Sequence, residues 1–154
     1  MSLAVQPAQL HDAFIVGHKL RPADKLEILE MRGQDSSPAA AVVEGFHMSK
    51  RPMSVYCEDR PVAMFGIVPV TDKDAVIWLL GTEEIEDHPM TFLRHSKEWL
   101  ERVISGYDFI YNFVHRENTL HIKWLEWLGF DFLDSHSESK FIFISYMSGV
   151  NNHV

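Results

Sequence analysis

The sequence is poor in cysteine, in long apolar runs and in positive charge. Its single cysteine, Cys57, excludes a disulfide within the chain and a cysteine-based metal site. No apolar run approaches the roughly 18 residues that a membrane-spanning helix needs, and the N-terminus does not have the pattern of a signal peptide. Lysine and arginine number 14 against 22 aspartates and glutamates, for a net charge of −8. We therefore expect a reducing compartment, no membrane span and no nucleic-acid partner.

Histidine is plentiful, but its spacing does not indicate a metal site. His88 and His95 are seven residues apart, and His115 and His121 are six apart. Neither spacing matches the i, i+4 pair of a zinc-binding helix, so we predict no metal. The length of 154 residues and the apolar fraction of 46% are ordinary for one globular domain. We expect a single domain over residues 1–148 and a flexible tail over 149–154.

The most informative stretch of the chain runs from Phe109 to Phe130. Residues 109–115 are aromatic and β-branched on both faces, which is typical of a strand buried on both sides. Asn118 suits the N-cap of a helix over 119–128, because its side-chain oxygen can accept from a free backbone N–H. Gly129 follows where a helix commonly ends in the left-handed conformation. The stretch therefore predicts a strand, a short turn and a helix.

The rest of the chain gives an alternating series of further elements. We expect strands at 3–6, 53–58, 62–70, 75–80, 131–134 and 140–146, and helices at 8–19, 25–31, 39–48 and 89–105. Asp24 is a candidate N-cap for the second helix, residues 81–88 form a polar loop, and Gly66 indicates a bulge or an edge position in its strand. Strands 75–80 and 109–115 flank a helix, so they should lie parallel in a β-α-β unit.

Two short motifs and this element order resemble the GNAT-type N-acetyltransferases. The string Asn118-x-x-x-Ile122-x-x-x-x-x-Leu128-Gly129-Phe130 resembles the family signature N-x-x-A-x-x-x-Y-x-x-x-G-F, and the strand containing Gly66 resembles a family strand with a central glycine. The resemblance implies an α/β (α+β) fold with a mixed central sheet, in the order β-α-α-(α)-β-β-β-α-β-α-β-β. In that fold the parallel strands 75–80 and 109–115 splay apart.

Within this superfamily the chain resembles certain phage-encoded proteins. The strings Trp-Leu-Leu-Gly-Thr at 78–82 and Trp-Leu-x-Trp-Leu-Gly-Phe at 124–130 are similar to those of internal virion protein A and of phage acetyltransferase-like proteins. The start of the chain, with a helix, Arg-x-Ala-Asp at 21–24 and a second helix, also resembles phage GNAT-like proteins. If the protein is phage-encoded, we expect it in the host cytoplasm or in the virion.

The resemblance also implies a cofactor site. Family members bind acetyl-CoA in the wedge between the two splayed strands and move its acetyl group to an amine. The pantetheine arm would pair with Leu79, Leu80, Gly81 and Thr82, and Asn118 would also contact the cofactor. A general base near the wedge must be a carboxylate or a histidine. Glu83 and His115 are the candidate catalytic residues by position.

The loop over 81–88 departs from the family pattern. It contains four carboxylates, at residues 83, 84, 86 and 87, and no glycine after Gly81, whereas the family places a glycine-rich, basic loop against the cofactor pyrophosphate. Like charges about 4 Å apart repel by about 1 kcal/mol even in water. Arg94 or Lys97 can supply compensating charge. The position of the family's tyrosine acid is Leu125, which carries no proton, and Tyr107 or Tyr111 would have to replace it.

Two functions are therefore open. The first is acetyl-CoA-dependent transfer to an amine with a degenerate pyrophosphate loop, and the alternative is a non-catalytic phage structural, ejection or interaction protein. The partner is correspondingly a small acyl-CoA or another protein, and the sequence leaves the oligomeric state open. Structural roles compete with each candidate site residue: Asn118 as a helix cap, His115 as a capping or solvated residue, and Asn112 as a core amide.

Overall fold

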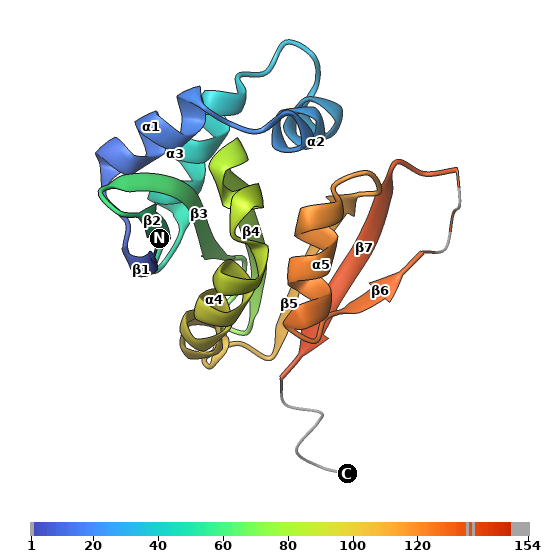
Figure 1. The fold of residues 1–154 in the computed structure, drawn as a ribbon. Helices are drawn as coiled ribbons and strands as arrows, with labels where there is room; N and C mark the ends of the chain where they lie inside the picture. The colour runs from blue at the N-terminus through green and yellow to red at the C-terminus, as the bar shows by residue number, and fades with distance from the viewer. Residues whose placement is uncertain (1, 135, 137, 149–154) are drawn as a thin grey trace.

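A computed structural model of the chain describes residues 2–134, 136 and 138–148 (Figure 1). Seven strands, five α-helices and one 3₁₀ helix make up this part of the chain. Their bounds are β1 (Leu3–Pro7), α1 (Leu10–His18), α2 (Pro22–Arg32), α3 (Pro38–Met48), β2 (Met53–Cys57), β3 (Arg60–Pro69), β4 (Asp74–Gly81), η1 (Glu83–Asp87), α4 (Pro89–Ile104), β5 (Phe109–His115), α5 (Thr119–Trp127), β6 (Asp131–Leu133) and β7 (Phe141–Met147). No described helix is both long enough and apolar enough to cross a membrane.

The strands form one mixed sheet in the order β1-β2-β3-β4-β5-β7-β6. Neighbouring strands are antiparallel except for β4 and β5, which are parallel and joined through α4. The β4–β5 pairing covers only residues 74–76 and 109–111, so the two strands separate toward their carboxyl ends. The expected mixed sheet, the element order and the splayed parallel pair are thus confirmed.

Helices cover the two faces of the sheet unequally (Figure 1). On one face α4 and α5 pack side by side over the main core, in which Trp124, Phe65 and Phe92 are fully buried. On the other face α1 and α3 pack against β3 and enclose a second core around Met64 and Leu80. Burial of such large apolar side chains is the main favourable term in folding.

Three local expectations differ from the structure. The polar loop contains the 3₁₀ helix η1, whose Ile85 is buried against Gly81. Helix α2 begins at Pro22 with Arg21 at the N-cap, so Asp24 lies inside the first turn and is not the cap. Proline is favoured at a first helical position because its missing N–H is not needed there.

Gly66 is also explained differently from the expectation of a bulge or an edge. It pairs regularly with Trp78 in the middle of the sheet, and the bulge of its strand lies at Val62, opposite the step between Val55 and Tyr56 of β2. A Cβ atom on Gly66 would lie 2.8 Å from Oγ of Ser49, which accepts a hydrogen bond from the Trp78 indole. The glycine therefore leaves room for α3 and its following turn to approach the sheet. The expected tail at 149–154 lies outside the described residues.

Candidate functional site

The site begins where β4 and β5 part. The last paired residues are Val76 and Tyr111. Directly beyond them, the side-chain Nδ2 of Asn112 donates to the backbone oxygen of Ile77 at 2.5 Å, and its Oδ1 accepts from the N–H of Phe113 at 2.7 Å. A side-chain hydrogen bond from Asn112 thus takes the place of a backbone hydrogen bond between β4 and β5. The two strands diverge from this point.

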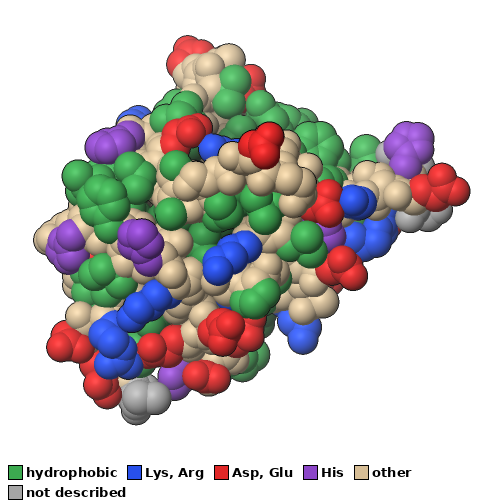
Figure 2. Space-filling model, turned by 90° about the horizontal axis from the view of Figure 1, so that it is seen from above, with side chains coloured by type: hydrophobic (Ala, Val, Ile, Leu, Met, Phe, Trp, Pro, Cys, Tyr) green, Lys and Arg blue, Asp and Glu red, His purple; other side chains and the backbone are tan. Residues whose placement is uncertain are grey.

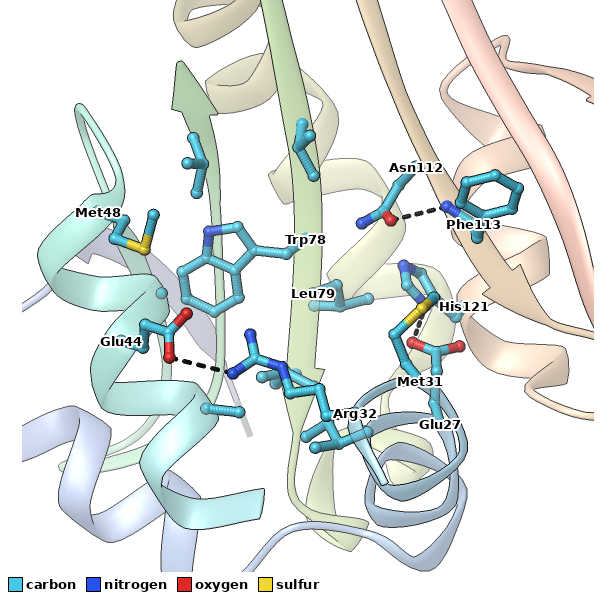
Figure 3. Close-up of a pocket in the computed structure, with 16 residues that line it drawn as sticks. Glu27, Met31, Arg32, Glu44, Met48, Trp78, Leu79, Asn112, Phe113 and His121 are labelled. Atoms are coloured by element: carbon cyan, nitrogen blue, oxygen red, sulfur yellow. Dashed lines mark hydrogen bonds and ion pairs between the residues drawn. The ribbon is translucent and has the colours of Figure 1, made fainter. Parts of the chain in front are cut away.

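A cavity of about 290 Å³ opens at the divergence, between α2, α3 and the two strands (Figure 3). Its walls are mostly apolar, with a few charged and polar groups. They include Glu27, Met31, Arg32, Glu44, Met48, Trp78, Leu79, Asn112, Phe113 and His121. Arg32 of α2 and Glu44 of α3 pair at 3.1 Å beside the cavity, and both are about half exposed. An apolar cavity with a few converging polar groups is the usual form of a small-ligand site.

The cavity also contains a buried polar pair, Glu27 and His121. Nδ1 of His121 lies 3.3 Å from Oε1 of Glu27, an ion-pair distance, but without hydrogen-bond geometry. The other oxygen of Glu27 accepts from the N–H of His115 at 2.8 Å and from the side chain of Asn118 at 3.2 Å. Burial by itself raises the pKa of Glu27, but the His121 charge and these hydrogen bonds outweigh it and hold that pKa below the ordinary value.

This pKa gives a testable pH dependence. A carboxyl group with a lowered pKa in the folded state stabilises the fold above its unfolded pKa, and this contribution is lost as pH falls through the folded pKa. We expect Glu27→Gln to flatten the decrease in the free energy of unfolding between about pH 5 and pH 3. Urea titrations across that range measure it. Glu44→Gln, at an exposed carboxylate, is the control and should keep the wild-type slope. Identical slopes for all three proteins would contradict the assignment.

The carboxyl end of β4 is capped by the start of α2. The N–H of Gly81 donates to Oδ2 of Asp24 at 2.8 Å, and its carbonyl oxygen accepts from the N–H of Arg21 at 2.9 Å. Leu20 and Thr82 add a bridge beside this pair. The backbone of Gly81 on the side facing the splay is therefore fully hydrogen-bonded within the chain. A Cβ on Gly81 would also lie 3.1 Å from Ile85, so the glycine serves packing of η1.

Arg21 holds this cap together from a buried position. Its guanidinium donates to both oxygens of Asp24, at 2.9 and 3.1 Å, to Glu86 at 2.8 Å, and to the side-chain oxygen of Asn118. Arg21, Asp24 and Asn118 are each at most 3% exposed. Burial would lower the pKa of Arg21, but hydrogen bonds and charge from Asp24 and Glu86 raise it above its ordinary value. The cap is thus a largely buried network centred on the charged Arg21.

The turn after β4 is strongly acidic at its surface. Two of its carboxylates are paired with arginines, Glu86 with Arg21 and Glu84 with Arg60 at 2.6 Å. Glu83 is exposed. Helix α4 then begins with Pro89, which has no N–H to offer a bound anion. The N-terminus of a helix attracts anions through free N–H groups, and here the first of them is missing beside the acidic turn.

The structure brings some of the sequence-predicted site residues together and separates others. Leu79 and Leu80 line the cavity. Gly81 and Asn118 meet through Asp24, whose Oδ1 accepts from the Asn118 amide at 2.9 Å. Thr82 faces β3, because its N–H and its hydroxyl both donate to the Val62 carbonyl.

The two candidate bases do not line the cavity. His115 is buried, with its Nδ1 accepting from the N–H of Glu117 at 3.1 Å and its ring against Phe141. Glu83 lies on η1. Sequence reasoning missed Arg21, Glu27 and His121 as site residues. The available signal was the placement of charged residues on the buried side of α2 beside Ile28.

The splayed pair, the sheet order and the helix arrangement match those of solved acetyltransferase structures. Ard1 from Thermoplasma volcanium aligns with a TM-score of 0.67 at 10% identity, over 96% of this chain and 98% of that one. The GNAT domain of S. lividans PAT aligns with a TM-score of 0.65 at 16% identity, over 93% and 89%. This chain has the GNAT fold. PaiA N-acetyltransferase from Thermoplasma acidophilum, in complex with coenzyme A, gives 0.64 at 10%, over 96% and 99%.

A family model covers part of the same region. Residues 69–137 match the family described as bacteriophage T7, probable scaffold protein Gp13. This segment runs from the end of β3 through β6 and includes the acidic turn and the splayed strands. No curated protein matches the sequence. At these identities the solved structures indicate the fold of this chain and leave its activity to the chemistry of the site.

Proposed function

We propose that this chain is a phage assembly protein that acts through protein contacts on a GNAT fold, without acetyl-CoA-dependent transfer. The strongest support is the backbone of Gly81, whose N–H and C=O are both bound by α2. The GNAT resemblance assigns the end of β4 to the pantetheine arm of the cofactor. The match of residues 69–137 to a phage family described as a probable scaffold protein supports the assembly role in particular.

Displacing the α2 cap would consume a large part of the binding free energy of a typical cofactor. Breaking a buried charged pair and leaving one partner uncompensated costs about 3–5 kcal/mol. A loss of about 4 kcal/mol weakens a ligand from roughly micromolar to roughly millimolar affinity. The carboxylates of η1 would add repulsion against the doubly charged pyrophosphate. The free energy available from binding acetyl-CoA is thus largely consumed.

Calorimetric titration with acetyl-CoA, and with desulfo-CoA as a stable analogue, tests the proposal. We expect no binding heat and no thermal shift up to about 1 mM ligand, because the β4 end is already hydrogen-bonded. PaiA from Thermoplasma acidophilum, a GNAT protein solved with coenzyme A, is the positive control in the same buffer. A dissociation constant tighter than about 100 μM for this chain would overturn the proposal.

Acyl transfer is the second candidate, and the pair of His121 and Glu27 favours it. His121 is 3% exposed, and its Nδ1 has no hydrogen-bond partner among the described residues although it lines the cavity. In a transferase, the amine nitrogen would attack the thioester carbonyl, the thiolate would leave, and His121 would take the proton released by the amine. Glu83 and His115 remain the alternative bases suggested by position.

Acetyl-CoA binding in the titration would favour acyl transfer over the assembly role. Mass spectrometry of a mixed amine panel would then detect the acetylated product, and His121→Gln should lower its rate of formation by about 100-fold or more. Equal rates in the variant and the wild type would exclude His121 as the base. Glu83→Gln and His115→Gln, measured in parallel, would show whether either of the position-based candidates fills that role.

A further inference from the structure

One face of the sheet is left uncovered at the β5–β7–β6 end. Cross-strand partners have their side chains on the same face, and three rows are defined by the register. They are Asp74–Phe109–Met147, Val76–Tyr111–Ser145–Asp131 and Phe113–Phe143–Leu133. The opposite face of these strands carries Ile110, Val114 and Ile144 into the core beneath α4 and α5. The three rows therefore lie on the side of the sheet that α1 and α3 cover at β3, and α2 reaches the carboxyl end of β5, where Glu27 accepts from the N–H of His115.

These rows form a continuous aromatic surface, which we call the sheet surface. Phe109 stacks on Tyr111 with ring centres 5.4 Å apart, Tyr111 lies 6.2 Å from Phe143, and Phe113 lies 5.2 Å from Phe143. Three of its apolar members are 44–61% exposed, namely Phe113, Met147 and Leu133. Exposed apolar patches of this kind on a soluble domain mark interaction sites.

Helix α1 carries a second exposed apolar surface, because small side chains face the protein interior and large apolar ones face outward. Its buried positions include the small residues Ala13 and Gly17, and a Cβ on Gly17 would lie 3.1 Å from Ala39 of α3. The large side chains Leu10, Phe14 and Ile15 instead point outward, at 40, 49 and 36% exposure. These three residues, with His11 and His18, form what we call the helix surface. In Figure 2 hydrophobic and histidine side chains gather on the side of the molecule where α1 lies in Figure 1.

The two surfaces complement each other in shape and charge. One is an apolar helix and the other an apolar sheet face, which is the commonest way for a helix to cover a sheet. The helix surface is flanked by Lys19, while Asp12, the only carboxylate of α1, is buried. The sheet surface is instead rimmed by the carboxylates Asp74 and Asp131. The like-charged pairings, helix on helix or sheet on sheet, lack this complementarity.

We propose that the helix surface of one copy of this chain docks on the sheet surface of a second copy. The two surfaces lie at opposite ends of the molecule, α1 at one end and β6–β7 at the other (Figure 1), so one chain cannot satisfy both by itself. A contact between two different surfaces is heterologous, and it propagates head to tail into a ring or an open chain. The inference rests on the proposed function, because it takes protein contact as the role of the chain and names the partner.

Sedimentation velocity on two matched variants tests this assembly. The wild type should form a concentration-dependent series of species between about 10 μM and 1 mM. Phe14→Glu in the helix surface and Leu133→Glu in the sheet surface should each sediment as a monomer. Mixed in equal amounts, the two variants should form a 1:1 dimer and nothing larger, because each supplies the surface that the other has lost. Both residues are largely exposed, so both variants should fold.

Met90→Glu is the control, since Met90 is 56% exposed on α4 outside both surfaces and should leave the series unchanged. If Phe14→Glu or Leu133→Glu loses the circular dichroism spectrum of the folded protein, Leu10→Glu replaces the first variant and Met147→Glu replaces the second. A wild type that stays monomeric at 1 mM, or a mixture that stays monomeric, would overturn the inference. Acetyl-CoA binding with intact assembly would instead overturn only the proposed function, so the two failures are distinguishable.

Discussion

Replacing Arg21 with methionine is expected to lower the free energy of unfolding by about 3–5 kcal/mol at neutral pH. The guanidinium is buried and is the cation that faces Asp24, Glu86 and the Asn118 oxygen. Without it, Asp24 remains a buried carboxylate whose remaining donors are the Gly81 N–H and the Asn118 amide. Urea denaturation followed by circular dichroism measures the loss as a change in midpoint at constant slope.

A matched arginine at the surface separates burial from charge. Arg116 donates to both oxygens of Asp134 at 2.6 and 2.8 Å, but both side chains are about one-third exposed or more. Arg116→Met should therefore lower the free energy of unfolding far less than Arg21→Met. The double variant Arg21→Met with Asp24→Asn should recover a large part of the loss, because it leaves no unpaired buried carboxylate. Equal losses for Arg21→Met and Arg116→Met would show that the buried network is not a stabilising unit.

The elements of the fold were predictable because their signals are local. The run over 109–130 combines a two-sided apolar strand, a capping asparagine and a terminal glycine, each read within a few residues. The structure confirms a strand at Phe109–His115 and a helix beginning at Thr119, with Asn118 accepting from the N–H of His121. Gly129 has a φ of 89°, as expected for a helix end. Here neighbouring residues alone determine the conformation.

The candidate site was largely unpredictable because its contacts are distant in the sequence. Arg21 reaches Glu86 and Asn118 across 65 and 97 residues, and no periodicity links them. Asp24 looked like a helix cap, whereas tertiary contacts with Gly81 and Asn118 hold it inside the first turn. The acidic loop was visible in the sequence, but only the fold shows that Glu86 is turned toward a buried arginine.

The same network gives the end of β4 partners from within the chain. In an open wedge, the free backbone groups at the end of β4 need a ligand or water as partner. In this chain Asp24 and Arg21 supply those partners for Gly81 from α2. At Gly81 the end of β4 therefore does not need a bound molecule to satisfy its backbone.

Replacing Trp124 with alanine is expected to be as damaging as the loss of Arg21, at about 3–5 kcal/mol. Trp124 is fully buried, packs against Phe65 and Phe92 with ring centres about 6 Å away, and donates from its indole N–H to Ser96 at 2.8 Å. It thereby ties α5 to α4 and to the sheet beneath the splay. Its removal leaves a cavity and takes away the donor of the Ser96 oxygen, which keeps its own bond to the Leu93 carbonyl, and urea denaturation measures the sum of both losses.

Two further tryptophan variants separate the contribution of the Trp124 hydrogen bond from that of its buried ring. Trp124→Phe keeps most of the ring volume and loses only the bond to Ser96, so it should cost about 1–2 kcal/mol. Trp127→Ala removes a 43% exposed ring that contacts Lys97, at a cost of at most about 1 kcal/mol. If Trp124→Ala cost no more than Trp127→Ala, α4 and α5 would be held by their remaining contacts.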